Sequence, residues 1–251
     1  MNLIPADYQP AADLLHDRII LITGAGDGIG ATAAKTFAAH GATVILLGRT
    51  IPKLEAVYDE ITSAGHPQPA IYPMDLEGAT YDQYEDLAAT LEQEFGRLDG
   101  LLHNAAILGA RMMVEQYDLK LWARVMHINL TAPFLLSRAC LPLLRNSADA
   151  RVVFTSTDIA QHGRAYWGAY GVSKAGADNL MQIMADELEA NTDIRVNSID
   201  PGMVATRIRR LAFPAEDAST LPTTDSVMST YLYLFGPDSK SETGQIFLAQ
   251  A

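Results

Sequence analysis

The chain has 251 residues, of which 49% are hydrophobic, and its formal net charge is −12 at pH 7. This length suits one α/β domain over residues 1–251 with a large core. The acidic balance excludes nucleic acid and anionic membranes as main partners, because like charges repel.

The start of the chain lacks the basic and apolar segments of a secretory signal. No apolar run approaches the ~20 residues that span a bilayer. We therefore expect a soluble cytoplasmic protein, with residues 1–17 as an N-terminal extension.

Short apolar runs alternate with longer segments of helical pattern. Strands are predicted at 18–23, 42–47, 70–74, 98–103, 150–156, 194–199 and 245–249, and helices at 28–40, 52–64, 81–95, 116–145, 165–190 and 224–235. Nearly continuous apolar strands that alternate with helices are typical of a parallel sheet covered on both faces. The sequence predicts an α/β fold with one doubly wound sheet of seven parallel strands.

Residues 210–224 form the one long stretch without such a pattern, and they include Pro214 and Pro222. A loop of this length in a compact domain is often a lid or a substrate loop. We expect a substrate loop at about residues 207–224.

The first predicted strand leads directly into the sequence TGAGDGIG, whose glycines are Gly24, Gly28 and Gly30. Glycines at the start of a helix let the chain turn sharply and let a pyrophosphate approach the backbone N–H groups. The pattern predicts a Rossmann-type dinucleotide site, to which Asp27 and Ile29 of the loop also belong. An ordinary glycine turn is the alternative.

The second strand ends at Gly48-Arg49, where an Asp or Glu would bind the ribose hydroxyls of NAD(H). A guanidinium at this position can bind a 2′-phosphate instead, so we expect NADP(H) rather than NAD(H). A solvated surface arginine is the alternative. Asp27 argues against the phosphate, because its carboxylate would repel it.

Asp75 and Leu76 follow the third predicted strand. Asp75 is positioned to meet the edge of the adenine. Its alternative role is to cap the next helix.

Tyr170 and Lys174 lie four residues apart in a predicted helix, so their side chains share one face. A positive charge ~4 Å from a phenol is worth up to ~4 kcal/mol at an effective dielectric of ~20. That would lower the phenol pKa from ~10 by about three units. The pair is therefore a candidate acid/base device for an alcohol or carbonyl oxygen. An exposed pair without a role is the alternative.

These features, taken together, resemble the short-chain dehydrogenase/reductase (SDR) family over nearly the whole chain. The resemblance is carried by TGAGDGIG, Asp75-Leu76, His103-Asn104-Ala105-Ala106, Asn129 in HINLTAPF, the Tyr170/Lys174 pair and Pro201-Gly202 in VNSIDPGMVAT. Within the family, the chain is most similar to the YciK-type oxidoreductases, as in GRAYWGAYGVSKAG.

The resemblance implies a role for each matching residue. Tyr170 would exchange the proton, and Lys174 would lower its pKa and bond the nicotinamide ribose. Asn129 would kink its helix and help to hold a proton-relaying water. The remaining matches would contact or support the cofactor, and they are Asn104, Ala105, Pro201, Gly202 and Thr206.

The family usually places a serine about thirteen residues before the tyrosine, to hold the substrate oxygen. Here that count falls on Thr157, with Ser156 one position earlier. Neighbouring side chains of a strand point to opposite faces, so only one of the two can face the site. We favour Thr157. If the strand ends before it, the local turn decides.

The resulting hypothesis is an NADP(H)-dependent oxidoreductase that acts on a small carbonyl/alcohol substrate. A non-catalytic NADPH-binding sensor or scaffold is the alternative. The resemblance implies a homodimer or homotetramer. We expect no catalytic metal, because the six histidines are scattered, and we expect His103 to be a satisfied core histidine.

Overall fold

The structure is a computed structural model, and it describes residues 1–250. Its sheet has seven strands in the order β3-β2-β1-β4-β5-β6-β7, and every neighbouring pair is parallel. The strands are β1 (Ile19–Thr23), β2 (Thr43–Gly48), β3 (Ala70–Pro73), β4 (Gly100–His103), β5 (Arg151–Thr155), β6 (Arg195–Asp200) and β7 (Ile246–Leu248). The predicted doubly wound α/β fold is confirmed.

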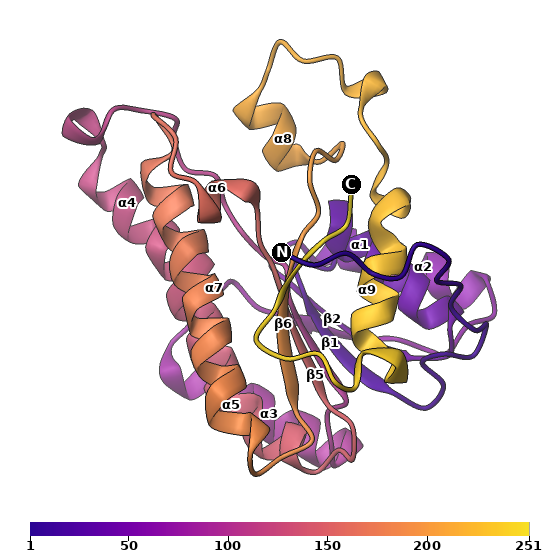
Figure 1. The fold of residues 1–251 in the computed structure, drawn as a ribbon. Helices are drawn as coiled ribbons and strands as arrows, with labels where there is room; N and C mark the ends of the chain where they lie inside the picture. Colours follow the sequence, from indigo (N-terminus) through magenta and orange to yellow (C-terminus); the bar gives the residue numbers. More distant parts are fainter. Residues whose placement is uncertain (251) are drawn as a thin grey trace.

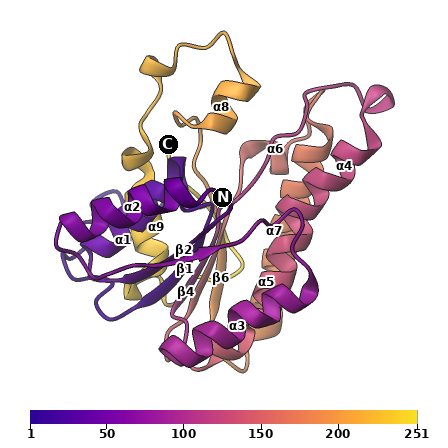
Figure 2. The same ribbon diagram turned by 180° about the vertical axis from the view of Figure 1, so that it is seen from behind.

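Helices cover both faces of this sheet (Figures 1 and 2). One side carries α1 (Gly28–Ala39), α2 (Ile51–Ser63) and α9 (Met228–Phe235), and the other carries α3 (Tyr81–Phe95), α4 (Leu119–Met126), α5 (Ala132–Arg145) and α7 (Gly168–Glu189). The short helices α6 (Asp158–Gln161) and α8 (Arg207–Ala212) lie beyond the carboxyl ends of the strands.

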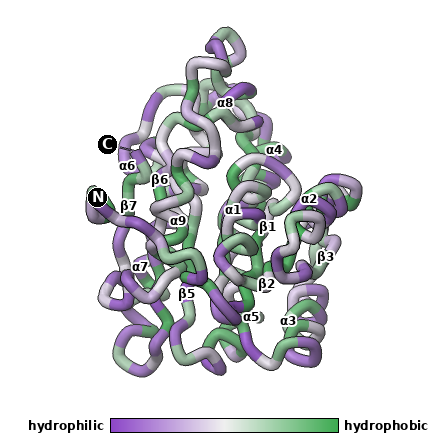
Figure 3. The backbone as a smooth tube through the Cα atoms, turned by 90° about the vertical axis from the view of Figure 1, so that its right-hand side faces the viewer, coloured by the Kyte–Doolittle hydropathy of each residue, from purple (hydrophilic) through white to green (hydrophobic). Residues whose placement is uncertain are grey.

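The core has two parts, because successive strand residues face opposite sides of the sheet. Ile20 and Ile22 pack into the cluster that contains α1 and α9, whereas Leu21 packs into the cluster with α3, α5 and α7. The central strands are accordingly hydrophobic along their length (Figure 3). Both faces of the sheet are buried under helices, which explains why the strands are continuous apolar runs in the sequence.

The single helix predicted at 116–145 is wrong. The chain instead forms a 3-10 turn (Val114–Gln116), then α4, a π-helical turn (His127–Thr131) and α5. Asn129 lies inside the π-helical turn, and its amide bonds both backbone groups of Ile107. A π turn inserts one residue into a helix and so changes the face that each later residue presents.

Two other predicted elements need correction near the carboxyl end of the sheet. The helix predicted at 165–190 begins at Gly168, and Tyr166 before it has a left-handed φ of 73°. The stretch expected to be irregular, 210–224, begins inside α8, for which the Thr206 hydroxyl accepts a hydrogen bond from the backbone N–H of Arg209. Side-chain capping of this kind stabilises a short helix.

The N-terminal segment is attached to the last strand. Asn2 forms a parallel bridge with Phe247 and exchanges backbone hydrogen bonds with Ile246 and Leu248, each of 2.8 Å. Tyr8 packs edge-on against Tyr233 of α9, with ring centroids 5.1 Å apart. Over the residues that the structure describes, no helix is both long and apolar enough to cross a membrane.

Candidate functional site

A cleft of about 900 Å³ lies at the carboxyl ends of the strands. It extends from the glycine loop after β1, past the end of β2, to Tyr170 on α7. In a doubly wound sheet, ligands bind at this edge, where the crossovers diverge to opposite faces.

The glycine loop is shaped for close packing on one side and for a ligand on the other. A Cβ atom at Gly30 would lie 2.3 Å from the carbonyl oxygen of Gly24, so only glycine fits there. At Gly28 the nearest atom would be a Thr206 methyl carbon at 3.8 Å, and φ is 53°. Gly28 therefore leaves backbone open to the cleft at the start of α1, where phosphate groups bind well.

The charge of Asp27 is paired with that of a neighbouring lysine. Its carboxylate accepts a 2.5 Å hydrogen bond from Lys53 of α2, and this bond holds its pKa below the usual range. The expected repulsion of a phosphate by Asp27 is thereby reduced.

Arg49 follows β2 and lines the cleft. Its guanidinium lies 4.0 Å from a carboxylate oxygen of Glu77, which Arg124 of α4 contacts more closely, at 2.7 Å. Because Arg124 already pairs with Glu77, Arg49 is left available for a further anion.

Asp75 and Leu76 both line the cleft. The Asp75 carboxylate accepts a hydrogen bond from the backbone N–H of Glu77, whereas the following helix is capped by Thr80. The helix-capping alternative for Asp75 is therefore wrong.

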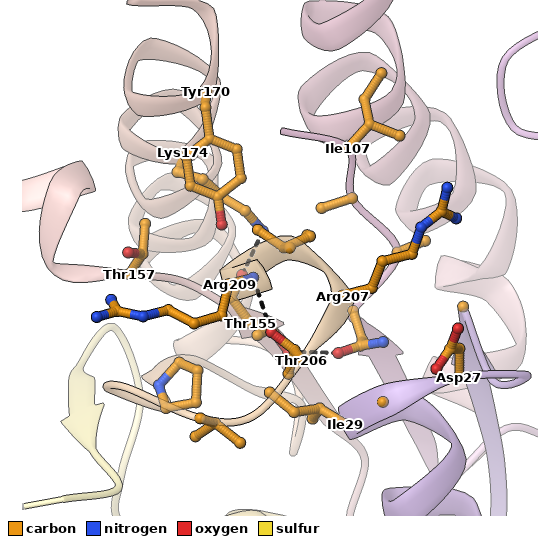
Figure 4. Close-up of a pocket in the computed structure, with 18 of the residues that line it drawn as sticks. Asp27, Ile29, Ile107, Thr155, Thr157, Tyr170, Lys174, Thr206, Arg207 and Arg209 are labelled. Atoms are coloured by element: carbon orange, nitrogen blue, oxygen red, sulfur yellow. Dashed lines mark hydrogen bonds between the residues drawn. The ribbon is translucent and has the colours of Figure 1, made fainter. Parts of the chain in front are cut away.

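Tyr170 and Lys174 lie on the face of α7 that is directed into the cleft (Figure 4). Both are nearly buried, with 8% and 5% of their surfaces exposed. The Lys174 ammonium donates a 2.6 Å hydrogen bond to the carbonyl of Thr155 at the end of β5. This bond fixes the ammonium at the floor of the cleft.

The expected acidification of Tyr170 is not found. Burial raises its pKa above the ordinary value, and the carboxylates of Asp200 and Asp158 raise it further. Burial also lowers the pKa of Lys174 to about 8, although Asp178 opposes that shift. Desolvation is the largest cause of both shifts, because both groups are shielded from water.

Ser156 and Thr157 point in different directions. Strand β5 ends at Thr155, so the turn decides their orientation. The Ser156 hydroxyl is 4% exposed and donates a 2.6 Å hydrogen bond to buried Asp178. Thr157 is half-buried beside Tyr170 (Figure 4), and its hydroxyl donates to Asp158 at 3.2 Å.

Asn129 and Asn104 form hydrogen bonds with other groups of the protein. The Asn129 amide donates to the Ser173 hydroxyl at 3.0 Å in addition to its bonds with Ile107. The backbone N–H groups of Asn104 and Ala105 each donate to the Thr23 hydroxyl at 3.0 Å. Asn104 and Ala105 line the cleft, so they join β4 to β1 beneath it.

The remaining residues named from the sequence also line the cleft, and they are Ile29, Pro201, Gly202 and Thr206. The carbonyl of Pro201 accepts a hydrogen bond from Gln250 at 2.6 Å, and Gly202 has a φ of 69°. This turn is therefore fixed in shape.

Four further cations that no motif of the sequence assigns to the cleft also line it, and they are Lys53, Arg164, Arg207 and Arg209. Lys53 lies in the first turn of α2, which begins directly after Thr50, so its closeness to Arg49 in the sequence could have indicated it. Arg207 stands at the mouth of the cleft between Ile107 and Asp27 (Figure 4). Among residues 1–250 it makes no ion pair.

His103 is a core residue. It is 4% exposed, one ring nitrogen lies 2.8 Å from the Ser137 hydroxyl, and burial lowers its pKa to about 3. Within the described part of the chain, no group of three or more His, Cys, Asp or Glu side chains is arranged to hold a metal ion.

Comparison of the whole chain with known proteins identifies a family that it matches. Residues 18–217 match the model of the short chain dehydrogenase family. The chain is 45% identical over 243 residues to the uncharacterized oxidoreductase YciK of Escherichia coli K12, covering 97% of this chain and 96% of that protein.

Solved structures agree. A structure from Pseudomonas syringae, described as a short chain dehydrogenase, is 53% identical, has a TM-score of 0.96 and covers 97% of this chain and 99% of its own. A short chain dehydrogenase structure from Escherichia coli CFT073, complexed with NADPH, is 45% identical, has a TM-score of 0.94 and covers 96% and 100% of the two chains.

Proposed function

Because the chain belongs to the short-chain dehydrogenase/reductase family, we propose that it is an NADP(H)-dependent oxidoreductase that interconverts a carbonyl and an alcohol. The observation that carries this proposal is the placement of Tyr170 and Lys174 in one cleft with the open glycine loop.

The cofactor fits the residues present. Gly28 offers unhindered backbone, Arg49 is available for a 2′-phosphate, and the relative from Escherichia coli CFT073 was solved with NADPH. Lys174, Asn104 and the turn at Pro201-Gly202 would hold the nicotinamide end. When bound, the nicotinamide supplies or accepts the hydride.

The chain's own residues would manage the proton. In reduction, Tyr170 would donate its phenolic proton to the substrate oxygen, and the nearby Lys174 ammonium would stabilise the phenolate that remains. The raised pKa of Tyr170 keeps the phenol protonated in the resting cleft. A group that begins as an acid is suited to reduction, because it carries the proton that the new alcohol needs.

The substrate oxygen would be held by Thr157 rather than by Ser156. The Ser156 hydroxyl is committed to Asp178 in the core. The Thr157 hydroxyl contacts only Asp158 at 3.2 Å and can rotate about χ1 toward Tyr170.

We also propose that residues 207–224 form the substrate loop of a single catalytic domain, with residues 1–17 as an extension. Support comes from Ala212, which packs on Tyr170 and Leu108, and from Phe213, which packs beside them.

A homodimer formed through α5 and α7 would bury Phe134, Val172 and Ile183, each about half exposed.

Tyr170→Phe provides the test of function. The variant removes only the phenolic oxygen, so it should fold and bind NADPH as the wild type does. We expect NADPH oxidation with a panel of ketones and quinones to fall by at least ~100-fold, the low end for a positioned acid.

Tyr58→Phe is a matched control, since Tyr58 lies on α2 outside the cleft. If wild-type protein binds NADPH but turns over nothing in the panel, the alternative of an NADPH-binding sensor is favoured. Turnover that survives in Tyr170→Phe removes the proposed mechanism.

A further inference from the structure

Four side chains, those of Leu108, Trp167, Ala212 and Phe213, pack around Tyr170 beyond the carboxyl ends of the strands, and together they form what we call the roof. Tyr170, Leu108 and Ala212 form a buried apolar cluster, against which Trp167 and Phe213 pack. The Trp167 ring lies 5.8 Å from that of Tyr170 and 5.9 Å from that of Phe213. The roof thus joins three separate segments, namely the loop after β4, the start of α7 and the end of α8.

Arg111 lies where these segments meet. Its guanidinium carbon is 4.9 Å from the centroids of both the Trp167 ring and the Phe213 ring. One of its nitrogens donates a 2.5 Å hydrogen bond to the carbonyl of Ala212. Ala212 is the last residue of α8, so Arg111 satisfies a free carbonyl at the negative end of that helix.

The backbone directly after Arg111 is fixed to the segment that carries Trp167. The N–H of Met112 donates to the carbonyl of Tyr166 at 3.2 Å, and Met112 forms a parallel bridge with Trp167. Tyr166 holds its left-handed φ of 73° at this contact. A non-glycine residue in that region costs free energy, and such strain concentrates at functional sites.

Apart from those of Arg111, the ion pairs and cation–π contacts of α8 and its flanking residues stay within their own segment. Arg209 stacks on Phe213 at 4.0 Å and pairs with Glu216 at 2.5 Å, and all three belong to the same segment. Arg111 has no carboxylate partner among residues 1–250. Its charge is balanced only by two ring faces and one carbonyl.

We propose that Arg111 is a positioning residue that fastens α8 over Tyr170 and so sets the apolar walls of the substrate compartment. It acts through Trp167 and Phe213, which it holds in place, and touches neither the reacting oxygen nor the cofactor. The inference rests on the proposed function where it concerns the substrate, whereas the fastening of α8 is a property of the protein alone.

Arginine suits this role better than lysine. A guanidinium is planar, so it can lie between two aromatic faces while its edge donates to a carbonyl. An ammonium could retain one of these contacts but not all three. The wall that Trp167, Ala212 and Phe213 form is apolar, so it favours a carbonyl flanked by hydrocarbon over a small polar ketone.

Helix α8 provides its own reporter, because Arg207, Arg209 and Arg210 are trypsin sites. Trypsin cuts only chain that has locally opened. In Arg111→Ala, we expect cleavage at these three sites to accelerate roughly tenfold to hundredfold, as the loss of two ring contacts and a charged hydrogen bond implies. Mass spectrometry of the fragments identifies the sites.

Arg138→Ala is a matched control, because Arg138 also stacks on an aromatic ring, that of Tyr81, at 4.8 Å and away from the roof. It should leave cleavage in α8 unchanged, and Arg111→Lys should fall between wild type and Arg111→Ala. Equal cleavage in wild type, Arg111→Ala and Arg138→Ala would overturn the proposal. If Arg111→Ala does not fold, the Lys variant decides on the same readout.

Fluorescence gives a second readout. Trp122 and Trp167 are the only tryptophans, so a Trp122→Phe background leaves Trp167 as the single reporter. Adding Arg111→Ala should raise acrylamide quenching of Trp167 about twofold or more, because its ring loses a covering group. Unchanged quenching would contradict the proposed contact.

A kinetic readout links the roof to the substrate. If the function holds, Arg111→Ala should raise KM for an apolar ketone about tenfold or more and change KM for acetone less than twofold, with the Kd of NADPH unchanged. If no ketone is turned over by the wild type, the function fails, yet the trypsin and fluorescence results still judge the fastening of α8. An equal change in both KM values would remove the role in specificity.

Discussion

The two ends of the parallel sheet use charged residues in opposite ways. At the amino end, Arg151 is fully buried and pairs with Asp149 at 2.6 Å, and Asp99 accepts hydrogen bonds from Ser147 and the backbone of Ile19. At the carboxyl end, Lys174 reaches only a carbonyl oxygen. At the amino end, paired charges connect neighbouring segments of the sheet, whereas the Lys174 ammonium faces the cleft without a carboxylate partner among residues 1–250.

The largest effect should follow from breaking the amino end. Asp149→Ala leaves the guanidinium of Arg151 buried without a carboxylate, and also removes an ion pair with Arg18. The free energy of unfolding should fall by about 3–5 kcal/mol. Urea unfolding measures the loss.

Asp59→Ala, at an exposed position on α2, should change the same quantity by less than about 0.5 kcal/mol. NADPH binding by folded Asp149→Ala protein should equal that of the wild type. An unchanged free energy of unfolding in Asp149→Ala would mean that the ion pairs at the amino end of the sheet do not stabilise the fold.

The next effect separates two neighbouring hydroxyls at the carboxyl end. Thr157→Ala should lower kcat about 100-fold, as the loss of a hydrogen-bond donor to a developing oxyanion does. Ser156→Ala should leave kcat within about threefold but lower the free energy of unfolding by about 1–3 kcal/mol, because it removes a hydrogen bond from buried Asp178. Steady-state kinetics and urea unfolding of both variants give the comparison. The reverse pattern would reassign the hydroxyl.

A smaller effect concerns the adenosine end. Arg49→Ala should weaken NADPH binding about tenfold and NADH binding less than twofold, since only NADPH carries the 2′-phosphate. The estimate is modest because the Arg49 side chain is 46% exposed. Titration of cofactor fluorescence measures both affinities.

Glu77→Gln sharpens this test. It removes the carboxylate that lies 4.0 Å from Arg49, so NADPH should bind slightly tighter. If Arg49→Ala weakens both cofactors equally, the NADP(H) preference is wrong.

The last effect is a dependence on pH. Lys174 has a pKa of about 8 in the folded chain against 10.5 for an ordinary lysine. Between these values the unfolded chain binds more protons, so the Lys174 contribution to the free energy of unfolding rises as pH increases from about 8 to about 10.5. Below pH 8 the ammonium is charged in both the folded and the unfolded chain, so its burial lowers the free energy of unfolding by the full desolvation cost.

This dependence can be measured against Lys174→Met, which cannot titrate. The difference in unfolding free energy between wild type and variant should shift in favour of the wild type as pH rises through that window. A difference that stays constant from pH 7 to 10 would show that Lys174 is not desolvated in the folded protein.

Much of the fold could be predicted because its signals are local. An apolar run such as β1 predicts a buried strand, and Gly24 and Gly30 predict a tight turn between a strand and a helix. The Tyr170/Lys174 spacing places both side chains on one face of a helix. The resemblance implied a kink at Asn129, but the hydrophobic pattern alone could not predict the π-helical turn, since one inserted residue leaves an ordinary helical pattern on either side. It depends on Asn129 meeting Ile107, which is distant in sequence.

The pKa of Tyr170 could not be predicted for a similar reason. Spacing indicates the charge four residues away, but burial comes from Leu108 and Ala212 in other segments. Helix α8 itself had signals that could have been used, namely Thr206 at its start and Arg209-Arg210 in its last turn. Ser156 and Thr157 stayed unresolved because strand alternation stops at Thr155.

The contact of Asn2 with β7 has a practical consequence for anyone who handles this chain. An open strand margin invites neighbouring molecules to add to it, and aggregation follows. Residue 2 already occupies that margin, so trimming the first few residues, or fusing a bulky purification tag in front of them, would expose it. Affinity handles belong elsewhere on the molecule.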